Sequence, residues 1–513
     1  MDVAETRASV DDIVARLERL PTSWWQVKAR IIVGVATFFD AFDALAIASV
    51  LPVIVPLWKL TPPQVGLMIS AGFLGQLLGA LLFGWIAERY GRMRAMVWSI
   101  ALFAVMSLVC ALAWDYNSLL MLRTIQGIGL GGEVPVAAVF ISELAKAQGR
   151  GRFVLLYELV FPIGLVAASL VGLWVVPHLG WQYMFVIGAL PALLALALRS
   201  LLPESPRWLA VHGRHAEAEA AMALIERETQ KRTRIAVKIG TGLVVIAIGC
   251  IILATGDAVI SLWRLSSNRV LLLLLVAVPI ALGGILTPFA AAMERKTKTT
   301  RLTILSSDQR ASWSDLFGPL YLRRTLVVWV IWFSAYFVNY GLSIWLPTVY
   351  RTVFKLPLDQ SLQYGLITQA VGLIGTLICA LAIDYVGRRL WFALAFAGAA
   401  AALAVLATYP APTAEQVLTC MSVAYFYIST INIGVYLYTP ELYPTRVRAL
   451  GVGTATAWLR FASMIGPTVV GMMIGSGLPA VFVTFAAVAG LAAVITGLFA
   501  VETRGRVLEE VSP

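Results

Sequence analysis

Long apolar runs, each about as long as a bilayer is thick, recur along the chain and are separated by short polar loops. A helix that crosses a membrane needs about 20 mainly apolar residues. By this criterion the first part of the chain predicts six membrane-spanning helices, at residues 30–57, 64–87, 95–113, 118–141, 153–176 and 182–201. The last part predicts six more, at residues 325–349, 362–383, 390–408, 415–439, 449–473 and 478–501. The pattern therefore predicts an all-α polytopic membrane protein built from two six-helix bundles.

The region between these two sets is unusual. The charged sequence HAEAEAAMALIERETQKR predicts an amphipathic helix outside the membrane. Two further apolar runs follow, at residues 239–255 and 270–292, and we predict that they form an extra transmembrane hairpin. Two crossings return the chain to the side that it left, which gives about 14 helices in all. The predicted parts are an N-terminal segment, a first bundle, a central loop, a second bundle and a tail, at residues 1–28, 29–202, 203–324, 325–501 and 502–513.

The two sets of six repeat one another. The sequence FDALAIASVLP ends at Pro52, and FVNYGLSIWLP ends 295 residues later, at Pro347. The sequence ERYGR begins at Glu88, and DYVGR begins 296 residues later, at Asp384. Landmarks at nearly constant separation indicate a duplicated six-helix unit, which is a recurring design of transporters.

Composition and charge support a membrane protein. The 513 residues are 60% hydrophobic and only 13% charged, whereas soluble domains are about 25% charged. A net charge of +11 raises the alternative of a nucleic-acid partner. We reject that alternative, because the basic residues lie in short loops that alternate with loops of little charge, which is the positive-inside pattern. Both termini are therefore expected in the cytoplasm.

The sequence contains no constellation typical of an enzyme. The four cysteines fall within apolar runs, and the three histidines lie in loops without the spacing of metal ligands. Residues 1–28 lack the apolar core of a signal peptide. We expect no catalysis, no metal, no cofactor and no disulfide framework.

Two aspartates, Asp40 and Asp43, lie within the first apolar run. Each carboxylate at a bilayer centre costs about 2.5–3.5 kcal/mol on insertion scales. Residues three apart share one face of a helix, so desolvation and mutual repulsion favour protonation of at least one of the pair. A carboxyl that gains and loses a proton suits proton coupling. The alternative is a structural pair of hydrogen-bonded carboxylates.

Three further ionisable residues are candidates for proton coupling: Arg123, Glu133 and Glu158. The first two flank the glycines of RTIQGIGLGGEVP, which superficially resembles a nucleotide-binding loop. Those glycines lie within an apolar run, so close helix packing is the better interpretation. Arg123 and Glu133 are either functional, or a structural intramembrane pair, or side chains that extend from the end of the span to the membrane interface. Glu158 either functions or extends to the membrane interface.

The loop GWIAERYGRMR and its counterpart in the second half each place an acid four residues before an arginine, with a glycine between them. One copy could be an ordinary solvated loop, but two copies at equivalent positions indicate a charge-assisted cytoplasmic gate. The predicted gate comprises Glu88, Arg89, Gly91, Arg92, Glu143, Arg150, Arg152, Asp384, Gly387, Arg388, Glu441, Arg446 and Arg448.

A substrate pocket is predicted from asparagines and aromatic residues within the seventh and tenth runs. Aromatic residues in membrane proteins usually serve packing, but asparagine beside tyrosine is less ordinary there. Such a pocket can stack on a flat ring and hydrogen-bond its polar edge. The candidates are Tyr336, Asn339, Tyr340, Trp345, Asn432 and Tyr436.

These motifs resemble the major facilitator superfamily. The gate sequences, PESPRWL, PELYPTRVRALGVG and VETRGRVLEE resemble its sugar-porter-like branch. Within that branch, GGEVPVAAVFISEL, VLLYELVFPIGLVAASL and YGLSIWLPTVY resemble bacterial niacin permeases and the related synaptic vesicle glycoprotein 2 proteins. The paired aspartates of DAFDAL are also similar to those of aromatic-acid:proton symporters.

The resemblance implies a fold of two six-helix bundles and roles for individual residues. It implies an acidic first-span motif at Asp40 and Asp43 and a fourth-span motif at Arg123 and Glu133. It also implies an acidic fifth-span position at Glu158 and an aromatic ligand contact at Trp345. Two features depart from the family pattern: Glu88 replaces the usual aspartate of the gate, and the hairpin at 239–292 is absent from the usual twelve-span plan.

We therefore expect a secondary active transporter that carries a small organic anion with a ring, such as nicotinate, benzoate or a hydroxybenzoate, together with protons. A sugar or polyol porter is the first alternative and a drug exporter the second. Outside transport, the alternative is a membrane receptor or scaffold, although such a protein needs no acid that carries protons. The expected state is a monomer in the bilayer of a bacterial inner membrane, with protons and a small molecule as its partners and no nucleic acid.

Overall fold

The computed structural model describes residues 13, 16, 24–144, 158–190, 202–231, 313–319 and 321–504. Regular structure in this part of the chain is entirely helical. Contacts divide the chain into two compact units, residues 1–257 with 357–363 and residues 258–356 with 364–513. The predicted hairpin at 239–292 and the second half of the predicted sixth span lie outside the described residues.

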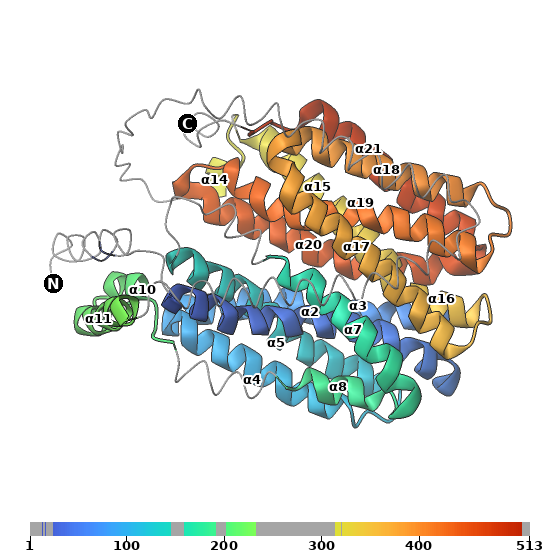
Figure 1. Ribbon diagram of the computed structural model, residues 1–513, viewed down its shortest axis with the longest axis horizontal. Coiled ribbons are helices and arrows are strands. Elements are labelled where there is room, and N and C mark those ends of the chain that lie inside the picture. Colours follow the sequence, from blue (N-terminus) through green and yellow to red (C-terminus); the bar gives the residue numbers. More distant parts are fainter. Residues whose placement is uncertain are drawn as a thin grey trace. The chain divides into compact units, whose positions relative to one another are not determined.

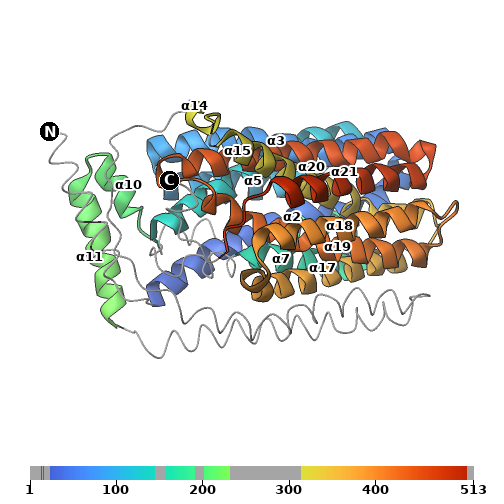
Figure 2. The same cartoon turned by 90° about the horizontal axis from the view of Figure 1, so that it is seen from above.

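The first unit is a bundle of long helices with two shorter helices at one end (Figure 1). Helix α3 packs along α5, α4 also packs along α5, and α2 packs along α7. The shorter helices α10 and α11 lie at one end of these long helices (Figure 2). The helices are α2 (Trp24–Trp58), α3 (Pro62–Tyr90), α4 (Arg92–Cys110), α5 (Tyr116–Leu144), α7 (Val160–His178), α8 (Gln182–Gly188), α10 (Pro206–Val211) and α11 (His215–Lys231).

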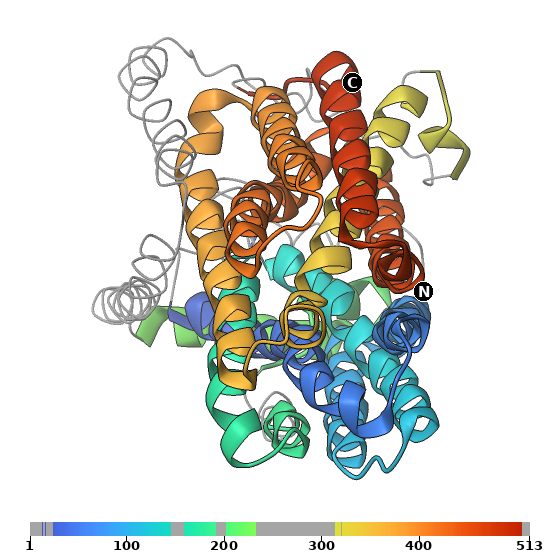
Figure 3. The ribbon, with the colours of Figure 1, turned by 90° about the vertical axis from the view of Figure 1, so that its right-hand side faces the viewer.

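The second unit has the same kind of organisation. Helix α18 packs along α21 and α19, and α15 packs along α20 (Figure 3). Its helices are α14 (Trp313–Leu316), α15 (Leu322–Ser343), α16 (Leu346–Thr352), α17 (Leu358–Val386), α18 (Arg388–Ala407), α19 (Ala414–Glu441), α20 (Thr445–Met473), η2 (Ile474–Ser476) and α21 (Leu478–Phe499).

The predicted spans agree with these helices. Among the described residues, 10 helices are long and apolar enough to cross a membrane. Helix α5, which is 29 residues long, occupies the fourth predicted span but is not one of these ten. The predicted seventh span is divided, because α15 ends at Ser343 and α16 begins at Leu346, with Pro347 in its first turn. The predicted amphipathic helix is α11.

Glycines explain how closely α3 and α5 approach. A Cβ atom on Gly75 would collide with the backbone oxygen of Thr124, and one on Gly79 would collide with that of Ile128. From the other side, a Cβ atom on Gly131 would collide with the backbone oxygen of Gln76. The packing interpretation of these glycines is therefore confirmed, since no larger residue fits at the crossing.

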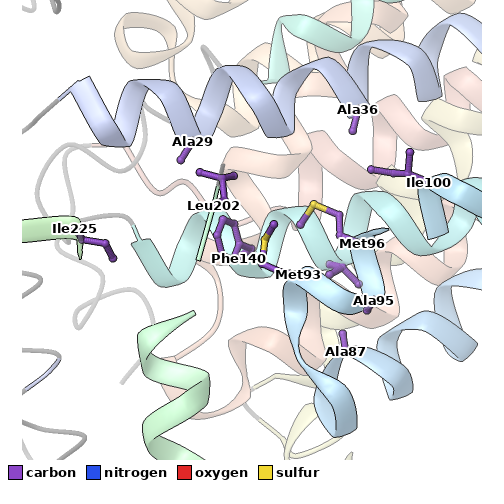
Figure 4. Close-up of a cluster of buried hydrophobic side chains, with 11 residues drawn as sticks. Ala29, Ala36, Ala87, Met93, Ala95, Met96, Ile100, Phe140, Leu202 and Ile225 are labelled. Atoms are coloured by element: carbon purple, nitrogen blue, oxygen red, sulfur yellow. The ribbon is translucent and has the colours of Figure 1, made fainter. Parts of the chain in front are cut away.

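Two apolar clusters hold the helices outside the bundle in place. In the first, residues of α2 and α4 pack with Phe140, Leu202 and Ile225, so that α11 is joined to the membrane helices (Figure 4). In the second, Ile13 packs with residues of α10 and α11 and is fully buried. Arg16 binds the same surface: its Nη1 lies 2.7 Å from Glu219 Oε2, and its Nε lies 3.0 Å from Glu226 Oε1.

Candidate functional site

A buried ion pair between Asp43 of α2 and Arg123 of α5 forms the centre of the first unit. Arg123 Nη1 donates to Asp43 Oδ2 over 2.7 Å, and the two side chains are 4% and 0% exposed. Gln126 completes a ring, because it accepts from the same Nη1 atom at 2.9 Å and donates through Nε2 to Asp43 Oδ1 at 2.8 Å. Both carboxylate oxygens of Asp43 are therefore engaged.

The surroundings of this pair are tight. Gln126 Nε2 also donates to Ser107 Oγ of α4 at 2.5 Å. The Phe185 ring lies 5.7 Å from the guanidinium carbon of Arg123, which is a cation–π distance. A Cβ atom on Gly72 would lie 3.3 Å from Arg123 Nη2. The site thus fixes the guanidinium on several sides and leaves little room for another arrangement.

This pairing differs from the one considered from sequence, which joined Arg123 to Glu133 on the same helix. In the structure Arg123 pairs with Asp43, and Glu133 Oε1 instead accepts from Thr37 Oγ1 at 3.4 Å. Sequence reasoning also missed Gln126. Its position three residues after Arg123 within an apolar run was an available signal, since residues three apart share a helix face.

Together these residues form a polar seam between α2 and α5. Asp40 belongs to it by position, because Thr37, Asp40 and Asp43 recur at three-residue intervals along α2, and Asp40 is 2% exposed. Glu158 is half-buried and lies two residues before α7 begins. None of the hydrogen bonds among the described residues joins Glu158 to the seam. The polar seam comprises Thr37, Asp40, Asp43, Arg123, Gln126 and Glu133.

A buried ion pair in a membrane helix bundle is sensitive to protonation. Removing one partner of such a pair leaves the other charge uncompensated, at a cost of about 3–5 kcal/mol. Loss of the negative charge on Asp43 would likewise leave the guanidinium of Arg123 in need of another anion.

An aromatic cluster lies in the second unit between α15 and α19. Tyr336 OH donates to the backbone oxygen of Asn432 at 3.2 Å, and its ring stacks with Trp332 at 5.7 Å between centroids. Trp332 also meets Tyr436 edge to face at 4.8 Å, and Tyr336 lies 6.0 Å from Tyr340. The structure thus brings together four of the six predicted pocket residues. It adds Trp332, which sequence reasoning missed.

Two amide oxygens of this region are buried without a hydrogen bond from any residue that the structure describes. They are Oδ1 of Asn339, a residue that is 3% exposed, and Oδ1 of Asn432. Gln369 Oε1 of α17 is likewise buried and has no hydrogen bond from the described residues. Buried polar groups in proteins are nearly always satisfied by protein, water or ligand. These acceptors therefore provide hydrogen-bonding capacity for a donor that the protein itself does not supply.

Trp345 is placed differently from the other predicted pocket residues. It lies between α15 and α16, is 3% exposed, and donates through Nε1 to the backbone oxygen of Pro467 at 3.1 Å. Its polar edge is therefore engaged with α20. Any contact that it makes with a ligand would have to use the face of its ring.

The predicted gate residues of the second unit form a compact ion cluster. Arg388 lies 2.8 Å from Asp384 and binds both oxygens of Glu441, at 3.0 and 3.2 Å. Thr503 Oγ1 donates to Glu441 at 2.6 Å. Glu441, Arg446 and Arg448 all belong to the predicted gate. In the structure Arg388 holds Glu441, because the turn before α18 brings that arginine to the end of α19.

The remaining gate residues are less fully described. Arg92 lies 3.0 Å from Glu88, which repeats the spacing of the second unit. The Arg89 guanidinium lies over the rings of Trp85 and Tyr90. Arg448 donates to the backbone oxygen of Tyr443 at 3.2 Å. The side chains of Glu143, Arg150, Arg152 and Arg446 lie outside the described residues.

Two glutamates that sequence reasoning did not single out complete both turns. Glu204 accepts from the backbone N–H groups of Arg92 and Met93, at 2.9 and 3.1 Å, and so caps the start of α4. Glu502 accepts from those of Arg388 and Arg389, at 3.0 and 3.1 Å, and caps α18. A carboxylate at a helix N-terminus satisfies free N–H groups and complements the helix dipole.

The turns themselves require glycine. Gly91 and Gly387 have φ values of +113° and +97°, and a Cβ atom on either would collide with the capping glutamate. A signal for the glutamates was present in the sequence, because PES at 203–205 and VET at 501–503 recur 298 residues apart. The repeat thus preserves a complete unit of glycine turn, arginine and capping carboxylate.

Comparison with known proteins identifies relatives over nearly the whole chain. Residues 33–437 match the profile of the Major Facilitator Superfamily. The chain is 30% identical over 511 residues to the niacin transporter NiaP of Acinetobacter baylyi, with 98% of this chain and 99% of that protein covered. It is 26% identical over 510 residues to the synaptic vesicle 2-related protein of Xenopus laevis, and the match covers 95% of this chain and 80% of that protein.

Among solved structures, the inward-open xylose transporter XylE from E. coli superposes with a TM-score of 0.63. The superposition covers 95% of this chain and 99% of that one, at 18% sequence identity. This likeness shows that the fold is shared.

Proposed function

The chain belongs to the major facilitator superfamily and is a membrane transporter, not an enzyme, and on this premise we propose that it carries a small ring-containing organic anion together with protons. Nicotinate is the first substrate to test, because the relative from Acinetobacter baylyi is named as a niacin transporter. Benzoate and hydroxybenzoates have the same two features, a flat ring and one carboxylate.

The observation that carries this proposal is the buried Asp43–Arg123 pair. An anion transporter needs a cationic group that is available at one stage of the cycle and neutralised at another. Arg123 meets this need if protonation of Asp43 releases its guanidinium, because a buried guanidinium without a counter-charge binds a carboxylate strongly. The proton and the anion would then enter together and leave together.

The second unit offers contacts of its own for a flat ring. The rings of Trp332, Tyr336 and Tyr436 form a surface on which a flat ring can stack. The unsatisfied amide oxygens of Asn339 and Asn432 suit a donor, such as the hydroxyl of a hydroxybenzoate or a protonated ring nitrogen. These contacts are supported by the chemistry of the side chains, and ligand titration tests them.

Membrane energetics favour coupling to protons for the uptake of an anion. Moving one negative charge inward against a potential of 100 mV costs about 2.3 kcal/mol. One accompanying proton cancels this electrical work, and a second proton lets the membrane potential drive uptake. We propose that Asp43 carries one proton and that Asp40, Glu133 and Glu158 are the other candidate carriers.

The proposal includes an orientation and a setting. Both termini lie in the cytoplasm, which is supported by arginines in the predicted cytoplasmic turns, such as Arg89, Arg92 and Arg389. The membrane is proposed to be a bacterial inner membrane, since the niacin transporter relative is bacterial. We propose a monomer as the working unit.

Uptake into proteoliposomes with an imposed pH gradient tests the proposal. Nicotinate, benzoate, xylose and a lipophilic cation are supplied in turn. We expect acid-driven accumulation of a ring carboxylate, its loss in Asp43→Asn, and its retention in Asp115→Asn, which alters an aspartate between α4 and α5. Xylose uptake that does not depend on the pH gradient would contradict this proposal and indicate a sugar porter. Extrusion of the cation would indicate an exporter, and ligand binding without transport a receptor.

A further inference from the structure

A groove lies beside the turn between α3 and α4, within the first unit. Its volume is about 490 Å³, which is within the range of ligand-sized pockets. Its apolar lining comes from Met93 and Val97 of α4 and from Leu202 and Pro203 of the chain before α10. Met93 and Leu202 also belong to the buried cluster of Figure 4, so the groove has a firmly packed floor.

The polar lining of the groove is dominated by a cation. Arg94 lines it and is exposed to solvent. The acidic residue of the lining is Glu204, whose carboxylate already accepts the backbone N–H groups of Arg92, Met93 and Ser205. Glu88 lies 3.0 Å from Arg92, so that this pair is neutral as a whole. Among the described residues, no carboxylate forms an ion pair with Arg94, whereas Glu204 is engaged by the capped turn, so Arg94 is available to bind an anion.

Aromatic rings continue from the groove along the neighbouring surface. Trp98 lines the groove and is 49% exposed. Its ring lies 6.0 Å from Tyr90, and Tyr90 lies 6.2 Å from Trp85. The Arg89 guanidinium is 5.6 Å from the Trp85 ring. Exposed tryptophan and tyrosine at the end of membrane helices are typical of the depth of lipid headgroups.

An apolar stripe leads away from Trp98 along α4. Val105 is 56% exposed and Leu108 is 47% exposed. Val105 follows Trp98 by seven positions and lies on nearly the same face of the helix, and Leu108 follows Val105 by three positions and lies beside it. In a membrane-spanning helix this stripe faces acyl chains. A ligand with an anionic head and a long hydrocarbon tail therefore matches both the groove and the stripe, whereas free phosphate matches only Arg94.

We propose that this groove is a binding site for one anionic phospholipid. Its phosphate binds Arg94, its headgroup lies against the rings of Trp98 and Tyr90, and an acyl chain follows Val105 and Leu108. Bound there, the lipid touches both α4 and the segment that carries Glu204. It therefore holds the capped turn at Gly91 against the membrane surface.

Native mass spectrometry of the purified full-length protein tests this site, with phosphatidylglycerol or phosphatidylcholine added in equal amounts. We expect preferential retention of phosphatidylglycerol and about a fivefold loss of that retention in Arg94→Gln. Arg94→Lys keeps the charge and should retain most of the lipid. The matched control is Arg323→Gln, which removes an exposed arginine that lies 5.3 Å from the Phe499 ring in the other unit.

Three results would overturn the proposal. In the first, Arg94→Gln retains as much phosphatidylglycerol as the parent protein. In the second, Arg323→Gln loses as much as Arg94→Gln, which would show a general attraction to basic surface. In the third, glycerol phosphate displaces the lipid at equal concentration, which would show a site for a soluble phosphate. Thermal unfolding in detergent without added lipid checks that each variant is folded, since both arginines are exposed.

Discussion

Asp43 and Arg123, 80 residues apart in the sequence, meet through a contact of 2.7 Å inside the first unit. One residue comes from α2 and the other from α5, so the pair joins two helices of the bundle as well as neutralising two buried charges. Gln126 holds both partners. The stability of the bundle and the proposed transport cycle therefore depend on the same three side chains.

Breaking this pair should affect stability and transport in separable ways. Asp43→Asn leaves Arg123 buried without a counter-charge, and we expect a loss of about 3–5 kcal/mol in the free energy of unfolding together with loss of uptake. The double variant Asp43→Asn with Arg123→Gln removes both charges and should recover much of the stability without recovering uptake. Thermal unfolding and proteoliposome uptake measure the two effects. A double variant no more stable than Asp43→Asn would contradict the pairing.

The α3–α5 crossing should tolerate no methyl group at Gly75. Its Cβ atom would collide with the backbone of Thr124, so Gly75→Ala should separate the helices and markedly lower the yield of folded protein. Gly84 lies in the same helix, with nothing within 4 Å of its Cβ position. Gly84→Ala should therefore be neutral or stabilising, by up to about 1 kcal/mol. Fluorescence-detected size-exclusion chromatography compares the two, and equal behaviour would refute close packing.

Removing a capping carboxylate should weaken the start of the helix that it caps. We expect Glu204→Ala to lower the stability of the first unit by about 0.5–2 kcal/mol, because the N–H groups of Arg92 and Met93 lose their acceptor. Glu502→Ala should do the same at α18. Hydrogen exchange measured by mass spectrometry should show faster exchange at residues 92–93 in the first variant and at 388–389 in the second. Faster exchange spread evenly over both sites would argue against local capping.

Asp115 provides a pH-dependent contribution outside the membrane spans. The Ser118 side chain and its backbone N–H hold the pKa of Asp115 below its ordinary value. A lowered pKa in the folded state means that the stabilisation is present at neutral pH and is lost as the pH falls through that value. Asp115→Asn should therefore lower the melting temperature at pH 7, and the difference from the parent protein should shrink as the pH falls through the lowered pKa of Asp115, because the parent carboxyl then becomes protonated. Ser118→Ala should behave similarly, and a pH-independent difference would exclude this origin.

The amide oxygen of Asn339 offers a test of substrate binding that spares the fold. Because this oxygen has no hydrogen bond within the described part of the chain, Asn339→Leu should leave the melting temperature nearly unchanged. If the oxygen binds the substrate, the apparent affinity for a ring carboxylate bearing a donor should fall by about tenfold. Trp345→Phe serves as the comparison. It removes the hydrogen bond to the backbone oxygen of Pro467, so it should lower the melting temperature more than the affinity for substrate. Unchanged affinity in Asn339→Leu would remove this residue from the substrate site.

The helices were predictable because one physical requirement dominates them. A run of membrane-length apolar residues has few alternatives to a helix in lipid, so α3 (Pro62–Tyr90) and α18 (Arg388–Ala407) lie close to the runs predicted at 64–87 and 390–408. The glycine-rich sequence of α5 and the local pairs Glu88–Arg92 and Asp384–Arg388 were predictable because each consists of residues close together in sequence.

The partners of buried polar residues were not predictable in the same way. The partner of Arg123 depends on the rotation of α2 and α5 about their axes and on their relative depth. The sequence of one helix determines neither of these quantities. The same holds for Glu204, which reaches Arg92 across 112 positions, and for Trp345, which reaches Pro467 across 122. Sequence reasoning identified Asp43, Arg123 and Glu441 as candidates but not their partners, because packing between helices decides which side chains meet.

The carboxylate-capped glycine turn bears on the history of the molecule. It is present in both units, with its glycine, its arginine and its distant glutamate in corresponding places. A feature shared by both copies is most simply inherited from before the gene doubled. The ancestral polypeptide, half as long, would then already have carried the turn, and would have needed a twin of itself to make a working carrier.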